Sequence, residues 1–396
     1  DDGMFGEGGD ADMIGGGTPD DGTIAAARQG NGLADGGESE MRGGDGEDWM
    51  TGDNARLDRV LDLDADEPDL VRLYDVRLAG GAAVPGGGDT MYGDAGTDRM
   101  FGQTGNDDMH GGDAPDYMEG NDGDDAIDGD AGDDDMIGGG SADDGIIDAD
   151  RQGNGLADGA ESLMSGGAGI DWMTGDNALI DRNVPSDAAG PIVLFDVETT
   201  ATGTIAGVGG GDTMHGNGDD DEMFGQTGAD TMLGGDGDDY VEGNNGDDTI
   251  RGEGDDDLLI GGGSADDGII IDTRVGNTLL DVGETLVSGG DGVDWMTGDN
   301  ARILRSGDVT GISLGPVRDL VLFDVQTVGG PTISASVSGG DVMEGNNGAD
   351  VIFGQGNGDQ SADQADPADG IDNDLDGRED PGSSEYDCSD GFDNDE

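Results

Sequence analysis

An apolar residue recurs every nine positions through two long stretches of the chain. Residues 93–137 divide into GDAGTDRMF, GQTGNDDMH, GGDAPDYME, GNDGDDAID and GDAGDDDMI. Residues 216–260 divide in the same way into GNGDDDEMF, GQTGADTML, GGDGDDYVE, GNNGDDTIR and GEGDDDLLI. The eighth place of every nonad is Met, Ile, Val or Leu. Because side chains alternate between the two faces of a strand, places seven to nine predict a short strand whose middle residue points inward.

The remaining places of the nonad indicate a turn that offers oxygen atoms. Every nonad opens with Gly and carries Asp at its sixth place. Glycines at the first, second and fourth places allow positive φ and a close approach of the backbone to an ion. The aspartate supplies carboxylate oxygen and the turn supplies carbonyl oxygen, and Ca²⁺ takes six to eight such ligands. This regularity argues against the disordered class to which the composition alone points.

These nonads resemble the calcium-binding repeats of RTX (repeats-in-toxin, haemolysin-type) proteins, whose pattern is G-G-x-G-x-D-x-U-x. The resemblance implies an all-β fold, a parallel β-roll or β-helix solenoid, in which two nonads make one turn and Ca²⁺ lies between successive turns. The inward residues would be Met100, Met109, Met118, Ile127, Met136, Met223, Met232, Val241, Ile250 and Leu259. The sixth-place ligands would be Asp48, Asp89, Asp98, Asp107, Asp116, Asp125, Asp134, Asp171, Asp212, Asp221, Asp230, Asp239, Asp248, Asp257, Asp294, Asp341 and Asp350. Residues 111–119 depart from the pattern, because Ala114 and Pro115 stand where the fourth-place glycine is expected.

A second, longer period of 123 residues divides the chain. The dodecapeptides GGDGEDWMTGDN at 43–54, GGAGIDWMTGDN at 166–177 and GGDGVDWMTGDN at 289–300 place their tryptophans at this interval. We therefore expect a partial first unit at 1–92, a second unit at 93–215, a third unit with a longer insert at 216–360, and an acidic tail at 361–396.

Two kinds of insert interrupt the nonads. The first includes RQGNGLADGGE at 28–38 and its later copies, in which Asp158, Glu161, Asp281 and Glu284 are candidate calcium ligands, as are Asp35 and Glu38. Their spacing fits an EF-hand loop poorly, and a solvated acidic turn is the alternative. The second kind contains LVRLYDVRL, PIVLFDVET and DLVLFDVQT, which predict β-hairpins that leave the roll. Such hairpins either cover an edge or provide a partner surface.

The dodecapeptide marks the point at which the roll gives way to a hairpin. Its tryptophan stands at the seventh, nominally outward place, directly before the second insert. We expect it to cover this junction, with Trp295 packing against Val321, Leu322 or Phe323.

Charge limits how such a chain can fold. Against 94 Asp and Glu there are 15 Arg and no Lys, so the formal net charge is −79. A compact state therefore needs bound cations or high salt, and nucleic acid is disfavoured as a partner. One inward residue per nonad buries little apolar area, so metal ligation has to stabilise the fold. An acidic surface of the halophilic kind, which folds in NaCl without Ca²⁺, is the competing explanation.

The last residues form a different acidic segment. DGIDNDLDG at 369–377 and DGFDNDE at 390–396 resemble the DGxDNDxDG calcium motifs of thrombospondin type-3-like modules. The resemblance implies ligands at Asp369, Asp372, Asp374 and Asp376, and an acidic linker is the alternative. Cys388 is the single cysteine, so the chain has no internal disulfide.

No catalytic constellation emerges from the sequence. The two histidines, His110 and His215, stand at outward ninth places, and zinc-protease, nucleophile-elbow and Walker motifs are absent. We expect a non-enzymatic, secreted calcium-dependent structural protein, such as a stalk, adhesin, surface layer or filament segment, which has calcium ions and copies of itself or other surface components as partners. The alternative is the repeat region of a secreted enzyme or toxin whose catalytic domain lies elsewhere. No apolar stretch is long enough to span a membrane, and the start at Asp1, within a repeat, indicates a piece of a longer chain.

Overall fold

The computed structural model describes residues 3–17, 36–58, 70–73, 86–141, 159–180, 182, 192–195, 209–264, 283–305, 317–323, 340–355 and 360–362. These residues form β-strands, turns and bends, and the predicted all-β fold is confirmed. None of them belongs to a helix that could cross a membrane. Contacts divide the chain into two compact units, the first made of residues 1–180 with 206–210 and the second of 181–205 with 211–396.

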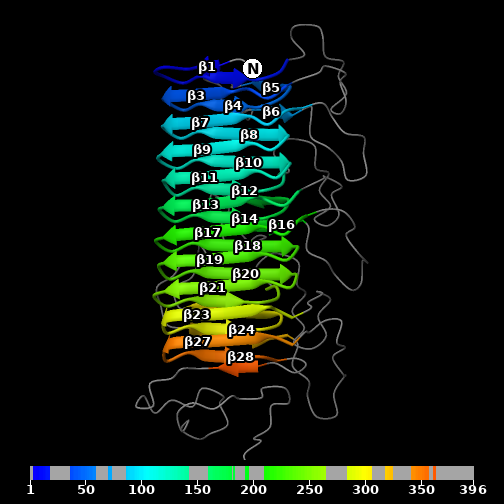
Figure 1. Cartoon of the computed structure of the whole chain (residues 1–396). Helices are drawn as coiled ribbons and strands as arrows, with labels where there is room; N and C mark the ends of the chain where they lie inside the picture. The colour runs from blue at the N-terminus through cyan, green and yellow to red at the C-terminus, as the bar shows by residue number, and fades with distance from the viewer. Residues whose placement is uncertain are drawn as a thin grey trace, which may run out of the picture. The chain divides into compact units, whose positions relative to one another are not determined.

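The first unit contains two parallel sheets, and consecutive strands of the roll alternate between them (Figure 1). One sheet has the order β1 (Gly3–Phe5), β3 (Glu40–Asp45), β7 (Thr90–Ala95), β9 (Asp108–Asp113), β11 (Ala126–Ala131) and β13 (Leu163–Ala168). The other has the order β2 (Asp12–Ile14), β4 (Trp49–Thr51), β8 (Arg99–Thr104), β10 (Tyr117–Asp122), β12 (Asp135–Ile137) and β14 (Trp172–Thr174). β15 (Ala178–Ile180) follows β14 in the chain.

The second unit repeats this arrangement. Its first sheet runs β17 (Thr213–Gly218), β19 (Thr231–Asp236), β21 (Thr249–Gly254), β23 (Leu286–Gly292), β27 (Val342–Gly348) and β29 (Gln360–Ala362). Its second sheet runs β18 (Glu222–Thr227), β20 (Tyr240–Asn245), β22 (Leu258–Ile260), β24 (Trp295–Thr297) and β28 (Val351–Phe353). β16 (Ile192–Leu194) also belongs to this unit.

Strand pairing shows that two nonads make one turn of the roll. Met118 on β10 pairs with Met100 on β8, eighteen residues earlier. The eighth-place side chains predicted to face inward are fully or almost fully buried, as at Met100, Met109 and Ile127. Where an insert intervenes the register is kept, since Ile127 pairs with Met164 and Met41 with Met91. The same kind of side chain therefore faces the core on either side of each insert.

The strands are longer than the three residues that the nonad pattern predicted. β10 covers Tyr117–Asp122 and so continues through the first three places of the next nonad, of which Asn121 and Asp122 pair with Gln103 and Thr104. Positive φ occurs at second and fourth places, such as Gln103 (φ 77°) and Gly105 (φ 139°). First-place Gly120 is not among the positive-φ residues, so the expectation of positive φ at the first place is wrong. Ala114 adopts φ 81° and makes the turn without the expected glycine.

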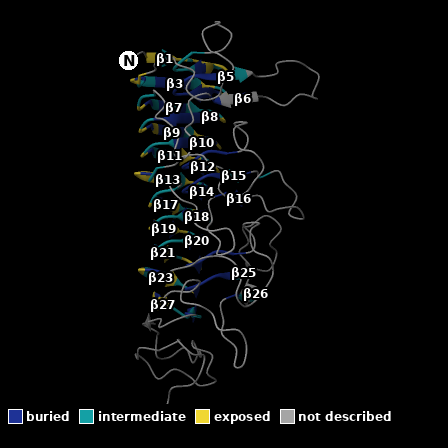
Figure 2. Ribbon diagram, turned by 90° about the vertical axis from the view of Figure 1, so that its right-hand side faces the viewer, coloured by how far each residue is buried: buried dark blue, intermediate teal, exposed yellow. Residues whose placement is uncertain are grey.

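Two antiparallel hairpins lie within single units, and each follows a tryptophan strand. β5 (Ala55–Asp58) pairs antiparallel with β6 (Leu70–Leu73), and β25 (Ala301–Arg305) pairs antiparallel with β26 (Val317–Leu322). Figure 2 shows each hairpin projecting beside the roll strands of its own unit. The predicted hairpin excursions are thus confirmed at these two places.

Trp49 and Trp295 lie at the junctions between roll and hairpin, as expected. Trp49 is 2% exposed and belongs to a cluster with Val71 and Leu73 of the hairpin. Trp295 packs against a cluster that includes Ile303, and Leu320 packs there too. Trp295 therefore lies against a cluster that includes a residue of its hairpin, and its packing against Val321, Leu322 or Phe323 stays a prediction.

Truncating the hairpin side of this cluster tests its contribution. Leu73 is fully buried, so Leu73→Ala leaves a cavity and should lower the free energy of unfolding by about 2–4 kcal/mol. Urea unfolding of the calcium-saturated chain, followed by tryptophan fluorescence, measures this. Val293→Ala is the control, because Val293 is 42% exposed and its truncation should change stability by no more than about 0.5 kcal/mol. Equal effects of the two variants would contradict a packed junction.

Candidate metal centre

The sixth-place aspartates lie in the turns between strands, and all are buried. Each is at most 3% exposed, although carboxylates are rarely buried without partners. The set comprises Asp48, Asp89, Asp98, Asp107, Asp116, Asp125, Asp134, Asp171, Asp212, Asp221, Asp230, Asp239, Asp248, Asp257, Asp294, Asp341 and Asp350. The fold thus places every sixth-place residue predicted as a ligand in the same kind of turn.

One carboxylate oxygen holds each turn to its neighbour. The backbone N–H of Asp89 donates to Oδ1 of Asp107 at 2.8 Å, and the N–H of Asp107 donates to Oδ1 of Asp125 at 2.8 Å. The same bond links Asp98 to Asp116 at 2.7 Å. Asp116 follows Ala114–Pro115, so the departure from the glycine pattern has not disturbed this turn. The Oδ1 atoms therefore form a fixed ladder along the roll.

The second oxygen is buried and has no hydrogen-bond partner within the described part of the chain. This holds for Oδ2 of Asp89, Asp98, Asp107, Asp116, Asp125, Asp230, Asp239, Asp248 and Asp257. A buried carboxylate oxygen without a partner is strongly destabilising. An unsatisfied carboxylate oxygen at nine equivalent positions is better explained by a bound cation at each turn than by nine independent destabilising arrangements.

Other oxygen atoms converge on the same space. A Cβ placed on Gly120 would lie 2.5 Å from Oδ2 of Asp125 and 2.6 Å from the carbonyl oxygen of Gly138. At Gly111 the corresponding distances to Asp116 Oδ2 and to the Gly129 carbonyl oxygen are 2.5 and 2.7 Å. The first-place glycine is thus required by space rather than by its φ. Carboxylate and carbonyl oxygens gathered around a compact gap are the donor set of a hard divalent cation.

Comparison with protein families agrees with this geometry. The model of the RTX calcium-binding nonapeptide repeat matches residues 86–118, 110–144, 202–232, 233–267 and 337–360. The chain carries RTX calcium-binding repeats. Comparison with curated proteins gives no match.

Burial sets the electrostatics of the RTX turns. It raises the pKa of Asp89 and Asp125 to about 7 and that of Asp116 to about 8. At Asp107 burial again raises the pKa well above its ordinary value, and the neighbouring carboxylate of Asp125 raises it further. Ionised carboxylates are therefore unfavourable in the folded RTX turns unless positive charge accompanies them.

The glutamates of the first insert join the RTX ladder rather than a separate loop. The N–H of Glu38 donates to Oδ1 of Asp89 at 2.6 Å, as a sixth-place aspartate would. A sixth-place aspartate stands two places before its inward residue, whereas Glu38 stands three places before the inward Met41. Its side chain, which is longer than that of aspartate, still lies beside the first-place glycine of the neighbouring turn, Gly15. Glu161 and Glu284 lie in the same way beside Gly138 and Gly261. The EF-hand-type spacing considered for this insert therefore does not describe these residues.

The remaining predicted ligands lie outside the described residues. They are Asp35, Asp158, Asp281, Asp369, Asp372, Asp374 and Asp376, together with the DGxDND tail, and they stay predictions.

Two buried polar groups of the RTX roll were not predicted. Asp53, in the GDN of the dodecapeptide, accepts hydrogen bonds from the backbone N–H (3.0 Å) and the hydroxyl (2.5 Å) of Thr104. Glu119 is fully buried and accepts from Tyr117 Oη at 2.5 Å and Ser141 Oγ at 2.6 Å. Both carry a sequence signal, because GDN recurs three times and Y-x-E-G-N recurs at 117–121 and 240–244. Glu119 was missed because the nonad pattern predicts that a ninth-place side chain points outward.

A methyl group in the oxygen-lined space should disrupt an RTX turn. Gly120→Ala would place its Cβ against Asp125 Oδ2 and the Gly138 carbonyl, so we expect weaker calcium binding and a higher calcium midpoint of folding. Gly8→Ala is the matched control, since a Cβ there has no atom within 4 Å. Calcium titrations of both variants by circular dichroism make the comparison, and equal midpoints would show that the space is not the binding site.

The raised pKa values predict an unusual pH dependence for the calcium-free chain. Because these aspartates bind protons more tightly when folded, their contribution favours the fold below about pH 4 and is lost as pH rises through about 7–8. β-structure should therefore appear on acidification of calcium-stripped protein, measured by far-UV circular dichroism without chelator. In saturating Ca²⁺ the direction reverses, because ligation needs ionised carboxylates. A calcium-free signal that grows with rising pH would contradict this.

Proposed function

We propose that this chain is a segment of an extracellular structural repeat protein that folds when Ca²⁺ enters the turns of its RTX roll. The unpartnered Oδ2 atoms of the nine sixth-place aspartates named above, such as Asp107 and Asp125, are the observation that supports it. Ca²⁺ would be held by Asp89, Asp98, Asp107, Asp116, Asp125 and their counterparts in the second unit, together with carbonyl oxygens of neighbouring turns. When bound, the ion supplies positive charge and closes the gap between turns.

Charge supports folding after export. A net charge of −79 opposes compaction, and each bound Ca²⁺ removes two negative charges from the balance. Sites of extracellular modules bind at about 10⁻⁴–10⁻³ M, a concentration that is met outside cells. The chain would thus stay open during transport and fold on arrival.

The inserted hairpins favour a structural role over that of a secretion tail for an enzyme. They recur with the 123-residue period and pack on the tryptophans of the roll, as at Trp49 with Leu73. An array that served only in export would need no such repeated excursions. We propose a stalk, adhesin, surface-layer or filament segment without catalytic activity, assembled with copies of itself or with other surface components.

A pair of neighbouring aspartates offers a direct test. Asp125→Asn keeps an oxygen to accept the Asp107 N–H and replaces the charged, unpartnered Oδ2, whereas Asp124→Asn removes the same charge from an exposed side chain. Calcium titration by circular dichroism, with Mg²⁺ and NaCl in parallel, should show β-structure with Ca²⁺ alone. We expect the calcium midpoint to rise about tenfold in Asp125→Asn, a loss of about 1.4 kcal/mol.

Asp124→Asn should titrate like the unmodified chain. Folding in NaCl without Ca²⁺ would support a halophilic surface instead. No β-structure at any calcium concentration would reject the calcium-dependent fold altogether.

A further inference from the structure

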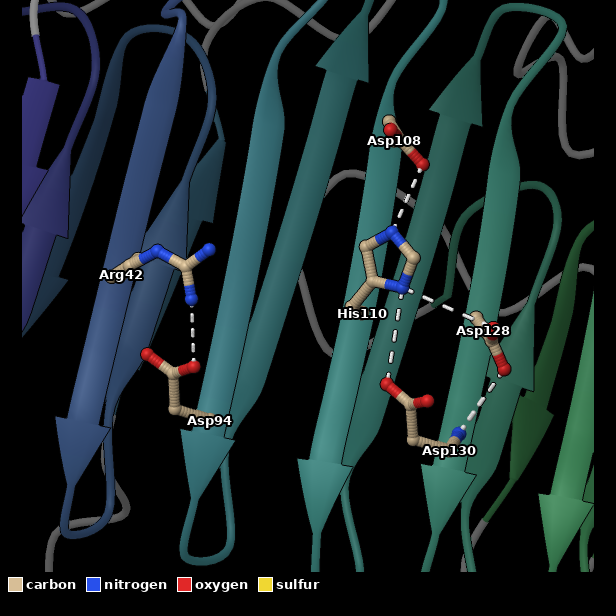
Figure 3. Close-up of polar contacts among 6 residues, drawn as sticks. All are labelled: Arg42, Asp94, Asp108, His110, Asp128 and Asp130. Atoms are coloured by element: carbon tan, nitrogen blue, oxygen red, sulfur yellow. Dashed lines mark hydrogen bonds and ion pairs between the residues drawn. The ribbon is translucent and has the colours of Figure 1, made fainter.

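A row of side chains crosses the outward face of the first sheet in the first unit. Arg42 on β3, Tyr92 on β7, His110 on β9 and Asp128 on β11 are paired in register from strand to strand. Figure 3 shows part of this row with Asp94, Asp108 and Asp130 beside it. These side chains stand at outward places, whereas the RTX ligands are buried in the turns.

Stacking fixes the imidazole of His110. Its ring lies on that of Tyr92 with 4.9 Å between centroids and 5° between planes. The guanidinium of Arg42 lies over the Tyr92 ring at 4.1 Å and is held by Asp94 at 2.9 Å and Glu40 at 2.6 Å. The ring orientation is therefore set by the strands and not by solvent.

Two carboxylates face one nitrogen of this ring. His110 Nδ1 lies 3.9 Å from Asp128 Oδ2 and 3.8 Å from Asp130 Oδ2. The N–H of Asp130 donates to Asp128 Oδ1 at 3.2 Å, which restrains the Asp128 side chain. The candidate ligand atoms of the three residues all lie within 4.8 Å of one another.

The opposite nitrogen has a carboxylate of its own. His110 Nε2 lies 3.4 Å from Asp108 Oδ1. Metal-binding histidines commonly direct their second N–H to a carboxylate, which fixes the tautomer and makes the ligating nitrogen more basic. Asp108 is placed for this supporting role, while Nδ1 faces Asp128 and Asp130.

We propose that His110, Asp128 and Asp130 form a surface site for a transition-metal dication of the Zn²⁺ type, separate from the calcium turns. Zn²⁺ binds nitrogen and carboxylate oxygen at about 2.0–2.2 Å, so tetrahedral ligand atoms lie about 3.4 Å apart. The two separations from His110 Nδ1, 3.8 and 3.9 Å, need a few tenths of an ångström of closure, and all three candidate ligand atoms lie within 4.8 Å of one another. Ca²⁺ takes oxygen ligands and has no use for the imidazole. The exposed sides of the residues leave a fourth position for water.

The other histidine provides a natural control. His215 stands at the same ninth place on β17, but the strands beside it present Leu233 and then Arg251 in register. Neither residue is a carboxylate, so the described surroundings of His215 lack the second and third ligands of the site.

Zinc titration of the full chain in saturating Ca²⁺ tests the site. Isothermal titration should detect one Zn²⁺ whose affinity falls at least tenfold in His110→Asn and in Asp130→Asn and is unchanged in His215→Asn. Co²⁺ in place of Zn²⁺ should give a visible absorption band that His110→Asn removes. Circular dichroism in Ca²⁺ should be the same for all variants, which separates loss of the site from loss of the fold.

Two results would overturn the proposal. One is zinc affinity that is unaltered in His110→Asn, which would show general binding to the acidic surface. The other is zinc uptake accompanied by equal release of Ca²⁺ in every variant, which would place the ion in the RTX turns. In either case the imidazole and carboxylates form only an ion pair, and calcium-dependent folding would be unaffected.

Discussion

The fold depends on one unfavourable arrangement, a column of aspartate oxygens that are buried without hydrogen-bond partners. The Oδ1 ladder ties each turn to the next, and in doing so it fixes Oδ2 of residues such as Asp107 and Asp125 in the interior. Burial makes the charged form unfavourable, and neighbouring carboxylates add repulsion. A divalent cation converts this same arrangement into a favourable one. Under the proposed function, folding and ion binding would therefore be a single event in such a roll.

The core alone is too thin to replace that interaction. Each nonad contributes one inward side chain, often methionine, which is flexible enough to stack on its equivalents along the roll. Additional apolar area comes from the hairpins, which bring Val71 and Leu73 onto Trp49. The described clusters at Trp49 and Ile303 lie where an insert leaves the roll. The hairpins thus add apolar packing at the points where the regular pattern is interrupted, while the uninterrupted turns would rely on the ions that we propose.

The nonad could be recognised in the sequence because the same residue types recur at the same places in successive copies. Asp at place six and an apolar residue at place eight predicted the row of equivalent aspartates and the core, whereas the resemblance to RTX repeats implied the two-nonad turn, and Met118 opposite Met100 confirms that register. The sequence did not show why the first place must be glycine. A Cβ at Gly120 would lie too close to Asp125 Oδ2 and to the carbonyl oxygen of Gly138, and that proximity is visible only in the folded chain. Glu38 was assigned to a separate loop for a similar reason. Glu38 takes the position of a sixth-place aspartate although it stands one residue further from its inward residue, Met41. The spacing in the sequence does not show that the longer glutamate side chain compensates for this residue.

Residues at outward places of the nonad are less constrained than those at inward places. The repeat constrains places one, four, six and eight through the ion and the core, so the outward side chains are free to differ from turn to turn. Parallel pairing in register then lines up these variable residues across neighbouring strands, as Tyr92, His110 and Asp128 show. A calcium-loaded roll would in this sense be a rigid frame, in which a substitution at an outward place changes the row of side chains on the surface without changing the core or the turns. If the frame folds only with its ions, as we propose, any function built on such a row would depend on calcium even when its own residues bind none.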